Sequence, residues 1–424
     1  MTTAPIIAFF PEASFGSSLN CVAIAQSLQK CGAEPVFICH PGFTGVFAEY
    51  GFREHHIVKE HPLQRDETEA YWQEYIQRHL PHFNLSPTEQ LDTYVSPTWN
   101  AIVDSAISVD QELADVLERV QPDLVVLDNV IMFPAIVNNR KPWVRIVSCA
   151  ETEIPDDNIP PYLSGLPIGN RPQYQAFLSK YETSIRNAHD RYMSFRKKRG
   201  LGSLPNTSFL ETSPWVNLIL APSIIQYPRK TALPTDQFVY LEGCVRHDTH
   251  FNVPDFSNND DPLVYLSFGS LGSIDIDLID RMIRAFESIA ARFIVNVGDF
   301  LDRYSRVPDN VFLGPWFPQP SVIKQADLFI HHGGNNSFCE ALYNGVPSLI
   351  MPYCWDGHDN ATRADETKVG LSLNRATWTN ASLHKTIKEL LNDKKMKQRL
   401  TSNAQQMQLN PGHEKAADAI LNCL

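Results

Sequence analysis

Short runs of hydrophobic residues alternate along the chain with longer stretches in which polar and apolar positions mix. Such runs have the length of buried strands, and in the first half they cover 6–10, 36–39, 124–128, 143–148 and 216–221. After a loop at 11–18, the stretch 19–31 predicts a helix that stops at Gly32. Strands separated by helices indicate a parallel sheet with right-handed crossovers, so the first half is predicted to be an α/β domain.

The same alternation starts again at Leu263. Strands are predicted at 263–268, 293–297 and 327–330, with a helix at 277–291. Between the halves, 247–262 is polar and interrupted by prolines, which is the composition of a linker. We therefore predict an N-terminal domain at 1–246, a C-terminal domain at 263–403 and a last helix, about 404–423, within 404–424.

The composition fits two globular domains. The 424 residues exceed one ordinary core, and 43% hydrophobic with 20% charged residues is typical of soluble proteins. The formal net charge of −12 argues against nucleic acid and against strong binding to anionic membranes. We interpret the basic run 196–199 as a solvated helix end, with a basic docking surface as the alternative.

Cysteine usage and the start of the chain bear on the compartment. The eight cysteines are scattered without C-x-x-C pairs or zinc spacings, so we expect free thiols, no metal site and a reducing cytoplasm. No basic segment precedes the strand at 6–10, and no apolar stretch approaches the 18 residues of a spanning helix. Neither a signal peptide nor a membrane span is therefore predicted.

The segment 316–359 carries the candidate chemistry. Trp316, with the amide of Gln319 nearby, precedes the strand at 327–330, which runs into His331-His332-Gly333-Gly334 and a helix from about Asn335. Glycines let the backbone approach phosphate oxygens, and the free N–H groups of a helix start bind anions. A histidine at the turn adds a donor, and Asp356 lies past a further strand end, where open α/β sheets bind ligands. This order of parts predicts a site for a nucleotide diphosphate sugar.

The segment resembles the nucleotide-sugar signature of the family 1 UDP-glycosyltransferases. The shared frame is W-x-P-Q, H-x-G-x-N-S-x-x-E, G-V-P and P-x-x-x-D, which here comprises Trp316, Pro318, Gln319; His332, Gly334, Asn336, Ser337, Glu340; Gly345, Val346, Pro347; and Pro352, Asp356. The resemblance implies the GT-B architecture, in which two doubly wound Rossmann-like α/β domains face each other across a cleft. It also implies that the last helix crosses back to the first domain.

The resemblance assigns a role to each matched position. Trp316 would stack on uracil beside Gln319, Glu340 would hold the ribose hydroxyls, and Asp356 the sugar hydroxyls. The diphosphate would be contacted by residues of two glycine-containing turns, namely Ser270, His332, Gly334, Asn336 and Ser337. Four of these positions also have a plain structural interpretation: Ser337 and Glu340 as a capping box, Trp316 as a core or rim residue, and His332 as a hydrogen-bonded structural histidine.

The chain departs from the family at several positions. Ser17 stands where members carry the histidine general base, and neutral serine cannot accept a proton near pH 7 without its own base. Asp128 matches the aspartate that normally orients that histidine. Asn335 stands where plant members have tryptophan, and Gly357 where many glucose-using members have glutamine, so the identity of the sugar stays open.

Two carboxylates are candidates for the missing base. Asp128 and Glu12 both lie just past predicted strand ends of the first domain, at the edge expected to face the cleft. Asp128 matches a family position and is placed first. Glu12 lies in the same loop as the lost histidine and has the longer reach, with an exposed loop carboxylate as the alternative. Burial that raises its pKa toward neutrality would make either one a usable base.

Two segments remain for the acceptor side. Tyr71, Trp72, Tyr75 and His79 fall on one face at helical spacing, which predicts either core packing or one wall of an acceptor pocket. The segment 155–172 is rich in proline and glycine and is predicted to be a long loop beside the cleft.

We therefore predict a cytoplasmic, metal-independent, inverting enzyme of natural-product type. It would move a hexose from a UDP-sugar, or alternatively a dTDP-sugar, to a hydroxyl of a small apolar or aromatic acceptor, with the donor as a substrate and no cofactor. Three alternatives stay open: a non-catalytic sugar-nucleotide-binding helper of a partner glycosyltransferase, a sugar-nucleotide epimerase, and a membrane-docked lipid transferase. The acceptor and the oligomeric state are not predicted.

Overall fold

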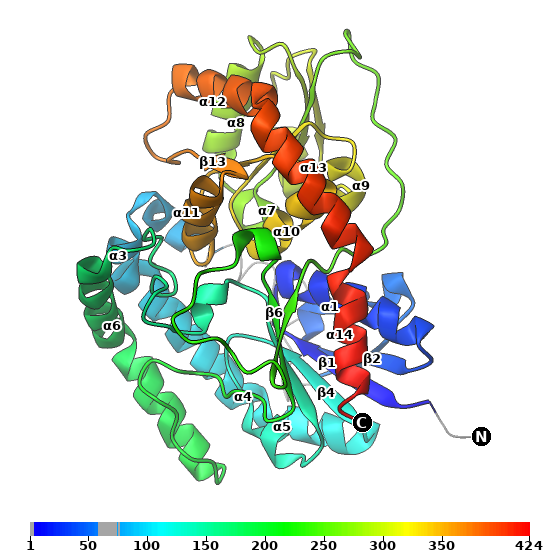
Figure 1. The fold of residues 1–424 in the computed structure, drawn as a ribbon, viewed down its shortest axis with the longest axis vertical. Coiled ribbons are helices and arrows are strands. Elements are labelled where there is room, and N and C mark those ends of the chain that lie inside the picture. The colour runs from blue at the N-terminus through cyan, green and yellow to red at the C-terminus, as the bar shows by residue number, and fades with distance from the viewer. Residues whose placement is uncertain (1–3, 58–73, 75–76) are drawn as a thin grey trace.

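The computed structural model describes residues 4–57, 74 and 77–424 (Figure 1). Its first half is built on a seven-stranded sheet in the order β3-β2-β1-β4-β5-β6-β7, in which the neighbouring strands pair in parallel. The strands are β1 (Ile6–Pro11), β2 (Glu34–Cys39), β3 (Arg53–His56), β4 (Leu124–Asp128), β5 (Trp143–Val147), β6 (Val216–Leu220) and β7 (Phe238–Leu241). The principal helices are α1 (Phe15–Lys30), α3 (Pro87–Gln90), α4 (Ser96–Val120), α5 (Pro134–Asn138) and α6 (Arg171–Lys198).

The second half repeats the plan with a six-stranded sheet in the order β10-β9-β8-β11-β12-β13, again with parallel pairs. Its strands are β8 (Leu263–Ser267), β9 (Arg292–Asn296), β10 (Val311–Gly314), β11 (Leu328–His331), β12 (Ser348–Ile350) and β13 (Gly370–Ser372). Its helices are α7 (Gly269–Gly272), α8 (Ile276–Phe286), α9 (Gln319–Ile323), α10 (Asn335–Asn344), α11 (Gly357–Thr367), α12 (Asn380–Asn392) and α13 (Lys394–Leu409). The predicted doubly wound α/β class is confirmed for both halves.

In each sheet, the order of the strands changes direction at one point, and this point lies at the domain interface. The reversal lies between β1 and β4 in the first sheet and between β8 and β11 in the second. Ligands of open α/β sheets bind beyond the carboxyl ends of the strands at such a point. Glu12 follows β1, Asp128 ends β4, Ser270 follows β8 and His332 follows β11, so four predicted site residues occupy the two reversal points.

The prediction of a single last helix at about 404–423 is wrong. The chain forms α13 to Leu409 and then a separate helix α14 (Gly412–Leu421). Pro411 breaks the ladder because it has no N–H to donate, and the Gly412 N–H instead donates to the Gly243 carbonyl oxygen at 3.0 Å. Side chains of α14, including Ala416 and Ile420, join the buried core of the first sheet, so the end of the chain does cross back (Figure 1).

Two local predictions of the first domain also need correction. The helix α1 begins at Phe15, so Gly16 and Ser17 lie in its first turn and the preceding loop is shorter than 11–18. The basic run at the end of α6 is not fully solvated, because Arg196 is buried and pairs with Glu211. The prediction for Tyr71, Trp72 and Tyr75 lies outside the described residues, while His79 is buried.

The domains are joined by the coil 247–262 and by direct contacts through α11. The Asp359 carboxylate accepts hydrogen bonds from the Thr152 hydroxyl at 2.7 Å, the Leu163 N–H at 2.9 Å and the Gly165 N–H at 2.8 Å. Thr152 lies in a short 3-10 helix (Glu151–Glu153), and Leu163 and Gly165 lie in the proline-rich loop that follows it. This loop is therefore fixed against the second domain. Within the described part of the chain, no helix is long and apolar enough to cross a membrane.

Candidate active site

The turn after β11 has a backbone that only glycine fits. Gly333 adopts a φ of +93°, a conformation that side-chain-bearing residues rarely reach. A Cβ at this position would lie 2.7 Å from the Gly357 carbonyl oxygen. Gly334 then serves as the N-cap of α10, and a Cβ there would lie 2.5 Å from Nε2 of His332. The turn therefore brings the main chain, the histidine ring and a helix start together.

The His332 ring lies between the two turns expected to face a diphosphate. It stacks on Tyr353 with ring centroids 4.9 Å apart, and a Cβ on Gly269 of the other turn would lie 3.1 Å from its Cε1. Ser270, the next residue of that turn, is exposed. Burial, aided by the charge of Arg375, lowers the pKa of His332 to about 4, so the imidazole is neutral at pH 7. Its Nδ1 has no hydrogen-bond partner among the described residues.

The capping-box interpretation of Ser337 and Glu340 is wrong. The helix α10 begins at Asn335, so Ser337 lies inside the first turn, and its hydroxyl accepts a hydrogen bond from Gln319 at 3.1 Å. The cap comes instead from a different loop, because the Asn335 N–H donates to the Asp356 carboxylate at 2.9 Å. The predicted sugar-side aspartate thus lies directly at the helix start.

Asn335 fastens that helix start to the first domain. Its side-chain amide donates to the carbonyl oxygens of Ser148 at 3.0 Å and Leu220 at 2.8 Å, which follow β5 and end β6. The helix start of the second domain therefore lies against the carboxyl ends of strands in the first domain. This contact is the structural role of an asparagine at the position where plant members have tryptophan.

Steric crowding also explains why glycine occupies position 357. A Cβ at Gly357 would lie 2.6 Å from the His332 carbonyl oxygen, so the observed turn leaves no room for the glutamine of many glucose-using family members. The neighbouring Asp356 is buried, and burial raises the pKa of its carboxyl group to about 7. Its second contact is the Asn360 side-chain amide at 3.2 Å.

The nucleoside end of the predicted site contains one exposed ring and one buried carboxylate. Trp316 is 59% exposed, which leaves its indole face accessible. Glu340 is 1% exposed, and its Oε2 accepts a hydrogen bond from Gln319 at 2.6 Å. Its Oε1 lies 2.9 Å from the Arg246 guanidinium and 3.4 Å from the Asn336 amide. The carboxylate expected on ribose therefore already has protein partners on both oxygens.

The two candidate bases of the first domain differ in environment. Asp128 is 1% exposed and both its oxygens are engaged, by the Ser148 hydroxyl at 2.5 Å and by the Cys21 thiol at 3.7 Å. Burial, followed by the charge of Glu12, raises the pKa of Asp128 well above its usual range. Glu12 is only partly buried, and its carboxylate accepts a long hydrogen bond from the Ser14 hydroxyl at 3.4 Å. Burial raises the pKa of Glu12 to about 7.

Electrostatic coupling connects the two domains across this point. Besides burial, the negative charge of Glu12 raises the pKa of Asp356. In the same way, burial and then the negative charge of Glu153 raise the pKa of Glu12. Glu153 is paired with Arg145, which lies within β5. Glu153 follows the end of this strand and lies close to Cys149. Sequence reasoning did not select Glu153, although its place after a predicted strand end was the same signal that selected Glu12. Ser17 is buried, and its hydroxyl accepts a hydrogen bond from the Ser14 hydroxyl at 3.3 Å.

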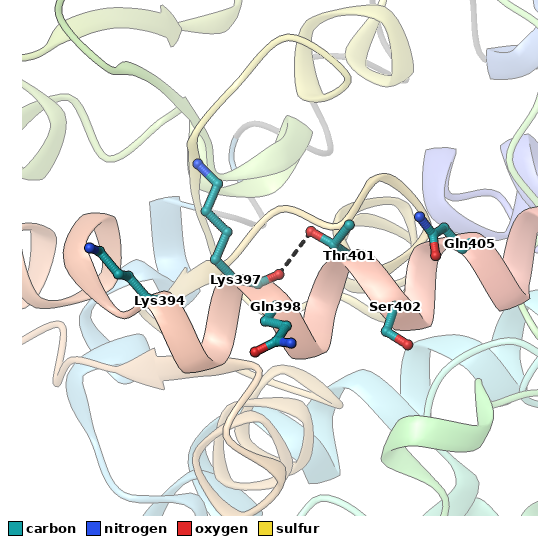
Figure 2. A pocket seen from close by; sticks show the side chains of 6 residues that line it. All are labelled: Lys394, Lys397, Gln398, Thr401, Ser402 and Gln405. Carbon is teal, nitrogen blue, oxygen red and sulfur yellow. Dashed lines mark hydrogen bonds between the residues drawn. The ribbon is translucent and has the colours of Figure 1, made fainter.

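Two further features lie apart from this arrangement. Within the described ranges, Cys39, Glu54 and His56 are the one group with metal-ligand spacing, but the Glu54 carboxylate already accepts N–H groups of Gly45, Phe47 and Ala48. A shallow hollow of about 360 Å³ runs along α13 (Figure 2). Its lining comes from this single helix, comprising Lys394, Lys397, Gln398, Thr401, Ser402 and Gln405, so no facing wall would enclose a ligand.

Comparison with known proteins agrees with the geometry. Residues 281–421 match the family model described as Erythromycin biosynthesis protein CIII-like, C-terminal domain. The NDP-glycosyltransferase YjiC of Bacillus subtilis (strain 168) is 24% identical over 327 residues, which cover 76% of this chain and 77% of the relative.

Solved structures share the whole fold at low identity. The glycotransferase of kitacinnamycin superposes with a TM-score of 0.72 at 18% identity over 100% of both chains. The glycosyltransferase VinC in complex with DTDP gives 0.65 at 17% identity over 99% of both. The fold is the GT-B architecture that the resemblance implied. The family model and the sequence relative agree with the resemblance to bacterial-type family 1 glycosyltransferases.

Proposed function

We propose that this chain transfers a hexose from a UDP-sugar to a hydroxyl of a small apolar or aromatic acceptor, with inversion at the anomeric carbon. A dTDP-sugar is the alternative donor, and VinC, with the same fold, was solved with DTDP. The observation that carries the proposal is the place of His332, whose ring lies between two glycine turns at the start of α10 with Nδ1 unpartnered by any described residue.

The leaving diphosphate would be stabilised by the protein itself. The first-turn N–H groups of α10 and the helix dipole favour negative charge at this point. His332 is neutral, so it would donate one N–H to a phosphate oxygen without adding a positive charge. As the bond from the anomeric carbon to the diphosphate breaks, these fixed donors would take up the developing charge. We therefore propose that no metal ion is needed.

The general base in this proposal is Glu12. A carboxylate with a pKa near the working pH combines a useful ionised fraction with enough basicity to take a proton. The acceptor hydroxyl would give its proton to Glu12 while its oxygen bonds to the anomeric carbon and the diphosphate leaves with the bonding electron pair. Asp128 is less suited, because its oxygens already accept hydrogen bonds from Ser148 and Cys21 and it is almost fully buried.

An aromatic cluster beside Asp356 supports an apolar or aromatic acceptor. Trp355 precedes this aspartate with a φ of +53°, and its ring lies 6.4 Å from the Tyr162 ring and 5.7 Å from the Trp99 ring. Strained backbone at such a position is often retained for function. The Tyr162 and Trp355 rings come from different domains and are only partly buried, so an acceptor bound against them would lie beside Asp356.

The proposal is tested with a panel of UDP- and dTDP-hexoses without any acceptor. Slow release of free hexose identifies the donor even when the acceptor is unknown, and the His332→Ala variant provides the matched control. We expect release from at least one donor and a reduction of at least about tenfold in the variant. Equal release by the wild type and the variant would show that the two glycine turns around His332 are not the donor site.

A further inference from the structure

Arg246 lies at the centre of a buried polar cluster beside the predicted nucleoside site. Its guanidinium is 2.9 Å from Glu340, 2.9 Å from Asp248 and 3.1 Å from the Tyr50 hydroxyl. The Arg246 and Glu340 side chains are only 3% and 1% exposed. Arg246 stands at the end of the first domain, directly before the linker, whereas Glu340 belongs to α10 of the second domain.

A buried ion pair of this kind needs a reason beyond stability. Removing both charges from water costs several kcal/mol, and apolar residues of similar volume often serve the fold as well. The pair is also tied to the predicted donor site, because the other Glu340 oxygen is held by Gln319 at 2.6 Å, and Gln319 reaches Ser337 at 3.1 Å. The contacts therefore fix the direction of the carboxylate rather than only neutralising it.

The contacts leave limited room for a ligand on Glu340. An ionised carboxylate has about four lone-pair positions. Arg246 and Asn336 face Oε1, while Gln319 takes one position of Oε2. The remaining acceptor position lies on Oε2, the oxygen turned toward Gln319. One ribose hydroxyl, and not two, can then donate a good hydrogen bond to this carboxylate.

We propose that Arg246 is a positioning residue of the donor site, which holds Glu340 so that one ribose hydroxyl of the nucleotide is recognised. The inference rests on the proposed function, since it assumes a nucleoside diphosphate at α10. It adds a residue from the linker side of the first domain to the donor site. When the recognised hydroxyl is the 3′ one, a 2′-deoxynucleotide loses no contact with Glu340, and one site would then accept both ribonucleotides and deoxyribonucleotides.

The test compares UDP with its 2′-deoxy, 3′-deoxy and 2′,3′-dideoxy forms by calorimetry. For the wild type we expect one monodeoxy form to bind within about threefold of UDP, and the dideoxy form to bind about tenfold more weakly or worse. For Arg246→Gln we expect the preference for UDP over the dideoxy form to fall to about twofold or less. Arg246→Lys should restore part of this preference, because the charge is retained.

Tyr50→Phe is the matched control. It removes a neutral partner of Arg246 and leaves the pair with Glu340 intact, so the UDP-to-dideoxy ratio should stay within about twofold of the wild type. If the Arg246→Gln variant binds UDP and all its deoxy forms more weakly by one common factor, then Arg246 has a structural role only. Tighter binding of UDP by that variant would mean that Arg246 blocks the ribose position, and tenfold losses with both monodeoxy forms would refute recognition of a single hydroxyl.

These outcomes are separable from the proposed function. A folded wild-type chain that binds none of the nucleotides would overturn the donor site and the inference together. A wild-type chain that binds UDP, but whose ratio is unchanged in a folded Arg246→Gln variant, would overturn the inference alone. If Arg246→Gln does not fold, Arg246→Lys decides: a ratio equal to that of the wild type contradicts the positioning role, because a lysine cannot reproduce the fork geometry of arginine.

Discussion

Changing Glu12 to glutamine should slow transfer and at the same time stabilise the fold at alkaline pH. Burial raises the pKa of Glu12 from its ordinary value of 4.5 to about 7. At about 1.4 kcal/mol per pH unit, this corresponds to about 3 kcal/mol of stability at most. The native state holds the proton more tightly than the unfolded chain does, so the wild type loses this stability as the pH rises from 4.5 to about 7.

Both effects are measurable on the same pair of proteins. Thermal unfolding at pH 5 and pH 8 should show Glu12→Gln gaining stability over the wild type mainly at pH 8, because glutamine has no proton to lose. Transfer to an alcohol acceptor should fall by about 10²–10⁴ in the variant, the usual contribution of a general base. The wild-type kcat/KM should rise with pH and level off above about 7, and the variant should lack this limb.

The control is Asp128→Asn. Asp128 is almost fully buried and its oxygens already accept hydrogen bonds from Ser148 and Cys21, so the amide should change transfer by less than about tenfold. A Glu12→Gln variant with wild-type transfer, or with the same stability difference at both pH values, would refute the assignment of Glu12. If transfer is slowed only in Asp128→Asn, the general base is Asp128, the residue that the sequence analysis placed first.

Three further outcomes follow from the geometry of the second domain. His332→Ala should weaken UDP binding by about 1.5–3 kcal/mol in calorimetry. His331→Ala should mainly lower the melting temperature, because His331 is fully buried and accepts the Gly333 N–H at 3.1 Å. A larger loss of UDP binding in His331→Ala than in His332→Ala would mean that the phosphate turn is assigned one residue too late. Gly357→Ala should impair both stability and UDP binding, since its Cβ would meet the His332 carbonyl oxygen at 2.6 Å, and unchanged values would contradict the packed turn. Asn335→Ala should leave two interdomain carbonyl groups without their donor and cost about 1–3 kcal/mol of unfolding free energy; a neutral result in denaturant unfolding would mean that these contacts do not hold the domains.

The parts of the fold that follow local rules were predictable from the sequence. Strands such as β4 and β8 are continuous apolar runs between helices, which is how doubly covered parallel strands are encoded. The phosphate turn after β11 was predictable for the same reason, because glycines, a histidine and a helix start are adjacent in sequence. Position beyond a strand end also selected Glu12 and Asp128, which the structure brings to one strand-order reversal.

The rest depends on contacts between distant segments. Ser337 and Glu340 have capping-box spacing, but Asp356 from another loop supplies the cap, which no local pattern encodes. The choice between the two carboxylates rests on burial and on the hydrogen bonds of Asp128, which are tertiary. Arg246 carries no motif at all: its place beside Glu340, 94 residues later, results from the packing of the two domains.

Calorimetric titration of UDP into the wild-type chain and the His332→Ala variant, with excess chelator present, tests the central claim most directly. The account predicts saturable binding to the wild type without added metal, and binding at least about tenfold weaker to the variant. Binding that requires magnesium, or equal binding by both proteins, would contradict a donor site built from the glycine turns and the start of α10.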